Sequence, residues 1–185
     1  MITLITGPMK SGKSTEMFRQ MERKHLAGKK VLYVGPKADT RAFYARGIPK
    51  SSLFAVARVQ VVDDWNKMSS KELKKLVKDF DAIFVDEYFM IENNVRLIEH
   101  LANEAHKDLV FGGLLADANA KLWTEAAEIL PYCDNVVKLL AICECCGSEY
   151  ANFSYKKGIE AGQIDVGDSK YKVLCRHCYL SKSKK

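Results

Sequence analysis

The amino-acid sequence predicts an α/β fold, in which helices flank a parallel sheet and a small cysteine-rich region follows near the C-terminal end. Short apolar runs alternate with helical patterns along most of the chain, an order that is typical of parallel strands joined by right-handed crossovers. The first strand leads into a glycine-rich turn, and two C-x-x-C pairs lie late in the sequence. A chain of 185 residues is long enough for one substantial core with an appendage.

The most informative motif lies between the first expected strand and the first expected helix. Positions 1–6 are apolar and β-branched, positions 7–14 read G-x-x-x-x-G-K-S, and a helix is expected from 15 to 27. Glycines allow a loop to turn its backbone N–H groups toward a polyphosphate, and the following helix directs its N-terminus at the anion. A chance match is the alternative, but the strand before the motif and the helix after it favour a P-loop NTPase-like fold.

Two residues of this phosphate loop have clear chemical tasks. Lys13 supplies a positive charge for the terminal phosphates, and the Ser14 hydroxyl is placed to ligate Mg²⁺. The candidate ATP- and Mg²⁺-binding residues in this segment are Gly7, Met9, Lys10, Ser11, Gly12, Lys13, Ser14 and Thr15.

The alternation of strands and helices continues after the first helix. Strands are expected at 31–34, 59–62, 82–85, 109–111 and 136–142, and helices at 69–80, 92–106 and 121–130. Ser69 or Ser70 is suited to cap the helix at 69–80. Gly47 and Pro49 indicate an irregular, mobile loop between 42 and 53.

A second carboxylate site follows the apolar strand at 82–85, which ends in Asp86-Glu87. In a chain with a phosphate loop this pattern has the Walker-B form, so Asp86 is expected to reach Mg²⁺ directly or through water. Glu87 could accept a proton from an attacking hydroxyl or water. The alternative is that both acids start a solvated loop. These two residues alone do not distinguish a kinase from an ATPase.

Four cysteines in two C-x-x-C pairs predict a metal centre. Each pair presents two thiolates from one tight turn, and two such turns complete a tetrahedral Zn²⁺ site without an open position, which makes the site structural. The predicted ligands are Cys143, Cys146, Cys175 and Cys178. This choice leaves Cys145 and His177 as non-ligands and Cys133 as a buried thiol. Two redox pairs are the alternative interpretation. The zinc would tie down the segment 147–174, which shows few signs of a core.

Composition restricts the function further. The net charge of +6 suits a polyanionic ligand, so a zinc-containing, nucleic-acid-binding ATPase is a competing hypothesis. The basic residues are scattered and form no stripe, which makes a nucleic-acid partner the weaker expectation. No apolar run reaches membrane-spanning length and the N-terminus lacks the pattern of a signal peptide, so we expect a cytoplasmic protein without a membrane partner.

These motifs, in this order, resemble the type II thymidine kinase family over most of the chain. The phosphate loop is shared by many NTPases, but its combination with an Asp-Thr-Arg segment and a zinc-bound C-terminal loop is specific to this family. The resemblance rests on Gly7–Ser14, Asp39–Arg41, Val85–Glu87, Gly113-Leu114, Val137–Leu139, the cysteine pairs and Lys170-Tyr171.

The resemblance implies an enzyme of nucleotide salvage for DNA synthesis that transfers the γ-phosphate of ATP to the 5′-hydroxyl of thymidine. Glu87 corresponds to the family's general base, and Asp39 and Arg41 to residues that serve the metal and the phosphates. The family is usually a homotetramer. Its members close a lasso loop over the base, which predicts a P-loop domain at 1–141, a zinc-binding lasso domain at 142–180 and a disordered basic tail at 181–185.

The resemblance also places the base pocket. Its expected substrate-binding residues are Met9, Met90, Leu114, Ala118, Trp123, Ser154, Val166, Gly167 and Tyr171. Met90, Ala118 and Trp123 depart from the family pattern, which has phenylalanine at positions 90 and 123 and an aromatic residue at position 118. Ser154 stands where threonine is common. Pocket shape alone discriminates weakly, so a looser pocket is expected to admit deoxyuridine, or another deoxynucleoside, besides thymidine.

Overall fold

The computed structural model describes residues 1–37, 43–45, 48–101, 107–156, 158, 160 and 170–183. The predicted site residues Asp39, Arg41, Val166 and Gly167 lie outside the described residues.

The centre of the fold is a six-stranded sheet in the order β5-β2-β6-β7-β1-β8, and every pairing within it is parallel. The strands are β1 (Ile2–Thr6), β2 (Val31–Gly35), β5 (Arg58–Val61), β6 (Ala82–Asp86), β7 (Asp108–Gly113) and β8 (Asn135–Lys138). The inner strands β1, β2 and β6 are almost wholly buried, as expected for a parallel sheet covered on both faces. The α/β prediction is therefore confirmed.

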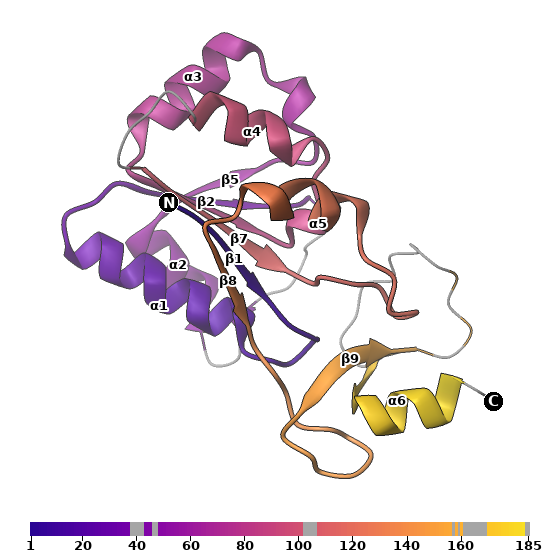
Figure 1. The fold of residues 1–185 in the computed structure, drawn as a ribbon. Helices are drawn as coiled ribbons and strands as arrows, with labels where there is room; N and C mark the ends of the chain where they lie inside the picture. Colours follow the sequence, from indigo (N-terminus) through magenta and orange to yellow (C-terminus); the bar gives the residue numbers. More distant parts are fainter. Residues whose placement is uncertain are drawn as a thin grey trace.

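Helices cover both faces of the sheet (Figure 1). α1 (Lys13–Leu26) and α2 (Lys50–Val56) lie on one face, and α3 (Ser70–Asp79), α4 (Asn94–Leu101) and α5 (Thr124–Ile129) lie on the other. Two apolar clusters result, one built around Met17, Met21 and Phe84 and the other around Trp65 and Phe111. The short elements are β3 (Phe43–Ala45), β4 (Ile48–Pro49), η1 (Trp65–Lys67), η2 (Tyr88–Met90) and η3 (Leu130–Tyr132).

Local sequence explains where α3 begins. The Ser69 side chain accepts a hydrogen bond from the backbone N–H of Glu72, and the Glu72 carboxylate accepts one from the backbone N–H of Ser69. This capping box satisfies two N–H groups that have no partner within the helix. Leu73, Leu76 and Val77 then form the buried face of the helix, at the spacing that the sequence predicts.

The C-terminal region forms a small layer of its own beside the edge strand β8 (Figure 1). β9 (Ala151–Tyr155) and β10 (Lys172–Cys175) form an antiparallel hairpin, and α6 (Arg176–Ser183) packs against it. The residues of its core include Ala141, Ala151, Val173, Leu174 and Tyr179. The expectation that 147–174 shows few signs of a core is thus wrong for its two ends, because Ala151 in β9 and Val173 and Leu174 in β10 are buried. Their burial does not follow a strict alternation, and the strands are too short to recognise in sequence.

Some predicted boundaries also differ. The expected irregular loop at 42–53 contains β3 and β4 and the start of α2, whose Leu53 is buried against the sheet. α4 begins at Asn94 rather than 92, and α5 begins at Thr124 because Trp123 has extended backbone. β8 ends at Lys138, short of the predicted 142. α6 continues through 181–183, which the sequence assigned to a disordered tail.

Candidate active site and metal centre

The phosphate loop connects β1 to α1 and depends on two glycines. A Cβ atom at Gly7 would lie 2.3 Å from the backbone oxygen of Leu139, so no side chain fits where the loop leaves the sheet. Gly12 has φ 86°, a left-handed conformation that turns the chain into α1. Lys10 also has positive φ, at 63°. The loop therefore curls above the N-terminus of α1, where the free N–H groups of a helix favour an anion.

Polar groups of the phosphate loop fit a bound phosphate. The Lys13 ammonium donates a 2.7 Å hydrogen bond to the backbone oxygen of Pro8, which folds the side chain back over the loop. The Ser11 hydroxyl is buried and has no hydrogen-bond partner among the residues that the structure describes. Ser14 and Thr15 occupy the first turn of α1, half-buried and exposed respectively. This donor set suits a phosphate or a metal–phosphate complex.

Asp86 and Glu87 stand at the C-terminal end of β6, on the same edge of the sheet as the phosphate loop. Asp86 is 2% exposed, and its two carboxylate oxygens accept hydrogen bonds from the Glu87 backbone N–H at 3.0 Å and the Tyr33 hydroxyl at 3.1 Å. Glu87 is half-buried with left-handed backbone angles of φ 48° and ψ 44°. Such a conformation costs a non-glycine residue about 1–3 kcal/mol and is common at functional sites.

Residues expected to line the base pocket lie after these carboxylates. Met90, Leu114 and Trp123 are half-buried and pack against the same apolar cluster. The Trp123 ring stacks on Phe89, with centroids 5.2 Å apart, and its indole N–H is buried without a hydrogen-bond partner in the described part of the chain. Gly113 leaves space for the neighbouring rings of Tyr88 and Phe89, because a Cβ atom at position 113 would lie 3.0 Å from the Tyr88 ring.

The C-terminal layer contacts both the phosphate loop and the pocket segment. The Met9 backbone N–H donates a 2.9 Å hydrogen bond to the buried Ser154 hydroxyl in β9, and the Met9 side chain packs against the core of that layer. The Tyr179 hydroxyl in α6 donates to the backbone oxygen of Ala118 at 3.3 Å. Tyr171 is buried, with the Lys156 ammonium 5.7 Å from its ring centroid. The described part of the C-terminal layer is thereby joined to the phosphate loop.

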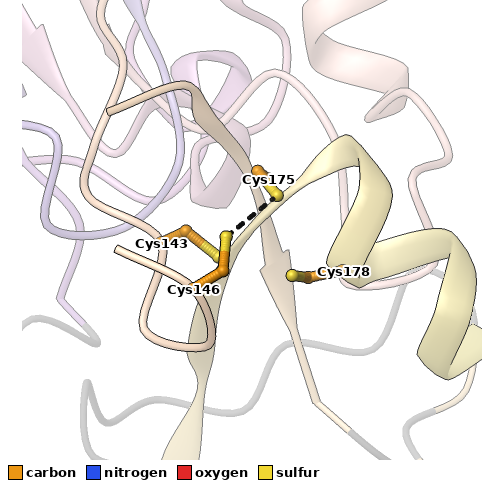
Figure 2. A group of neighbouring side chains, drawn as sticks. All are labelled: Cys143, Cys146, Cys175 and Cys178. Carbon is orange, nitrogen blue, oxygen red and sulfur yellow. Dashed lines mark hydrogen bonds between the residues drawn. The ribbon is translucent and has the colours of Figure 1, made fainter. Parts of the chain in front are cut away.

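The four predicted cysteine ligands converge on one point (Figure 2). The sulfurs of Cys143, Cys146, Cys175 and Cys178 all lie within 4.8 Å of one another, and those of Cys146 and Cys175 are 3.7 Å apart. A tetrahedral zinc with Zn–S bonds of ~2.3 Å separates its sulfurs by about 3.8 Å. The donor set and spacing therefore fit Zn²⁺.

Electrostatics distinguish the cluster from the remaining thiols. Burial raises the pKa of the Cys143 thiol, but hydrogen bonds from the backbone of Cys175, Cys145 and Cys146 outweigh this effect and lower it to about 6. Hydrogen bonding to Cys146, followed by burial, raises the pKa of Cys178, as expected when neighbouring thiols share one negative charge. Cys133 lies outside the cluster and is half-buried, with a pKa raised by burial to about 11.

Sequence reasoning missed three residues that contact the candidate site. Tyr33 binds Asp86, Glu144 forms an ion pair with Lys10, and Tyr179 binds the pocket segment. Glu144 carried a signal, because it is an acid between two predicted ligands. Tyr33 carried a weaker one, as a hydroxyl within an otherwise apolar strand.

Comparison with known proteins identifies the family. A family model described as "Thymidine kinase" matches residues 1–179. The chain belongs to the thymidine kinase family. A thymidine kinase of Myxoma virus (strain Uriarra) is 33% identical over 181 residues, which cover 97% of this chain and 96% of the viral protein.

Members of the thymidine kinase family from other organisms match over a similar share of this chain. The thymidine kinase of Pseudothermotoga lettingae is 29% identical over 96% of this chain and 94% of its own length. Thymidine kinase 1 of Dictyostelium discoideum is 32% identical over 97% of this chain and 78% of its own length. Membership of a kinase family implies ATP and a divalent metal. No helix in the described part of the chain is long and apolar enough to cross a membrane.

Proposed function

We propose that this chain transfers the γ-phosphate of ATP to the 5′-hydroxyl of thymidine. The observation that carries the proposal is the hydrogen bond between Met9 and Ser154. It holds the phosphate loop against the β9 arm of the segment that the family resemblance assigns to the nucleoside. A phosphate donor in the loop and a nucleoside beside the hairpin would then meet near the C-terminal end of β6.

Each group of the site has a task in this reaction. The phosphate-loop residues from Gly7 to Thr15 would bind the ATP phosphates, and Lys13 would exchange its bond to Pro8 for one to a phosphate oxygen. Ser14 and Asp86 would hold Mg²⁺, which when bound neutralises the phosphate charge. Glu87 would accept the proton of the attacking 5′-hydroxyl. Asp39 and Arg41 keep their proposed roles toward the metal and the phosphates.

The cysteine cluster would serve structure rather than chemistry. Four thiolates fill the coordination sphere of Zn²⁺ and leave no position for a substrate. The cluster links the turn after β8 to β10 and α6, and so would fix the base of the lasso in a domain at 142–180, beside the P-loop domain at 1–141. The homotetramer is proposed from the family resemblance alone, and the cytoplasmic location is proposed from the sequence pattern.

The base pocket is proposed to accept thymidine and deoxyuridine. Met90, Leu114, Ala118, Trp123, Ser154 and Tyr171, with Val166 and Gly167, are its proposed residues. A nucleic-acid-dependent ATPase is not favoured by the family membership.

A nucleoside panel with a Glu87 variant tests the proposal. ADP release should require a pyrimidine deoxynucleoside and should not respond to single-stranded DNA. Glu87→Gln should lower kcat by about 10²–10⁴ with little change in the KM for thymidine, because a general base acts in the transition state. Glu99→Gln, at an exposed position of α4, is the matched control. Thymidine-independent turnover, or an unchanged kcat for Glu87→Gln, would refute the assignment.

A further inference from the structure

Tyr33 and Asp86 lie on neighbouring strands and on the same face of the sheet. Tyr33 of β2 is in register with Phe84 of β6, which in turn is in register with Val110 of β7. All three belong to the apolar cluster beneath α1. Asp86 comes two residues after Phe84, and side chains two apart along a strand share a face. The Tyr33 side chain therefore has to reach along the sheet toward the strand ends to meet Asp86.

The contact is a buried hydrogen bond to the predicted metal ligand. The Tyr33 hydroxyl donates to Asp86 Oδ2 at 3.1 Å, and the two residues are 6% and 2% exposed. The second carboxylate oxygen, Oδ1, accepts the backbone N–H of Glu87. Each oxygen of Asp86 thus has a donor that fixes the rotation of the carboxylate in a site with little access to water.

Gly35 leaves the space that this contact needs. A Cβ atom at position 35 would lie 3.1 Å from the Tyr33 hydroxyl oxygen and 3.2 Å from its ring. Gly35 ends β2 with a strand conformation that other residues also adopt. The small residue is therefore explained by the path of the Tyr33 side chain toward Asp86, rather than by backbone conformation.

We propose that Tyr33 is a positioning residue for phosphoryl transfer, which orients the Asp86 carboxylate toward Mg²⁺·ATP. The proposal rests on the metal-binding role assigned to Asp86 under the proposed function. Hydrogen-bond partners behind a metal ligand set its orientation and basicity, and their loss typically lowers metal affinity by about 10–100-fold. Tyr33 has no expected contact with the substrates, so its loss should change the metal requirement rather than nucleoside binding.

Tyr33→Phe tests the proposal, because it removes only the hydroxyl. The Mg²⁺ concentration for half-maximal activity should rise by about tenfold or more, with an unchanged KM for thymidine. A second measurement does not depend on turnover: a fluorescent, non-hydrolysable ATP analogue is bound at increasing Mg²⁺ concentrations. The Mg²⁺ concentration for half-maximal binding should also rise. Tyr132→Phe removes a hydroxyl from an exposed ring and should leave both measurements unchanged.

Two further variants separate the possible outcomes. Gly35→Ala should displace the Tyr33 hydroxyl and reproduce the shifted Mg²⁺ requirement in a folded protein. Asp86→Asn should raise the Mg²⁺ requirement further than Tyr33→Phe does. If Asp86→Asn raises it while Tyr33→Phe changes only thermal stability, the positioning role is overturned and the proposed function stands. If Asp86→Asn leaves the Mg²⁺ requirement unchanged, the metal role of Asp86 fails and the role of Tyr33 falls with it.

Discussion

Lys10 of the phosphate loop and Glu144 of the first cysteine turn form an ion pair, with Lys10 Nζ 2.6 Å from Glu144 Oε1. The other Glu144 oxygen accepts the backbone N–H of Val173 in β10, and the Glu144 backbone N–H donates to the Val173 oxygen. The hydrogen bond from Lys10, followed by that from Val173, lowers the pKa of Glu144. The phosphate loop is thus linked by charge to the turn that bears two of the proposed zinc ligands.

The energetic contribution of this ion pair should be small. The two side chains are 42% and 36% exposed, and exposed pairs contribute about 0–1 kcal/mol. Lys10→Met and Glu144→Gln should each lower the free energy of unfolding by at most about 1 kcal/mol, and the double variant should cost little more than either. Urea unfolding of the zinc-bound protein measures this, with Lys29→Met as an exposed control. Fully additive losses would show that the pair has no coupling.

Zinc content should discriminate between neighbouring cysteines. One zinc per chain is expected, and Cys145→Ser should retain it, because Cys145 is exposed and outside the cluster. Cys146→Ser should lower zinc affinity, since its sulfur lies 3.7 Å from that of Cys175. Elemental analysis and competition with a chromogenic chelator measure both effects. Zinc loss in Cys145→Ser with retention in Cys146→Ser would reassign the turn.

The parts of the fold that follow local rules could be predicted from the sequence. β1, the phosphate loop and α1 follow from apolar periodicity and the positions of Gly7 and Gly12. The capping box at Ser69 follows from its spacing to Glu72. The convergence of the four cysteines could be predicted because two C-x-x-C turns leave few other ways to bind one ion.

Contacts between distant segments could not be predicted in this way. The bonds from Tyr33 to Asp86 and from Met9 to Ser154 depend on strand order and register, which no local pattern specifies. The hairpin of β9 and β10 was missed for the same reason, because each strand is short and is stabilised by a partner far away in sequence.

Lys13 should be required for turnover but not for folding. It is half-buried on the phosphate loop, and its ammonium group bonds to the Pro8 backbone oxygen. Lys13→Ala removes a charge that would stabilise the transferring phosphoryl group, and the loss of one such preorganised group typically costs about 10²–10³ in kcat. The thermal unfolding temperature should change little. Steady-state kinetics together with circular dichroism measure both, and near-normal turnover in a folded variant would remove the phosphate-loop assignment.

The enzyme should discriminate weakly between thymidine and deoxyuridine, which differ by one methyl group. It should discriminate strongly between pyrimidine and purine nucleosides, which differ in ring size. Thymidine and deoxyuridine differ by one methyl, and a difference of that size in an apolar pocket changes kcat/KM by roughly 10–200-fold at most. In the proposed pocket Met90 and Ala118 would form a softer wall than aromatic residues, so we expect a ratio near the lower limit. Purines should be poor substrates, because a wrong base leaves buried polar groups unpaired at about 1–3 kcal/mol each.

The stacked pair of Phe89 and Trp123 indicates which side of the proposed pocket should control selectivity between pyrimidines. Their rings lie 5.2 Å apart between centroids, so Trp123 would give its side of the proposed pocket a rigid wall, whereas the Met90 side chain can adapt its shape. Met90→Phe should therefore raise the preference for one pyrimidine over the other, while Leu130→Phe, at an exposed position, should not. Competition between thymidine and deoxyuridine in one reaction measures the ratio directly. Efficient phosphorylation of deoxyadenosine or deoxyguanosine would contradict the pyrimidine pocket, because a ring system of that size requires the wall to have moved.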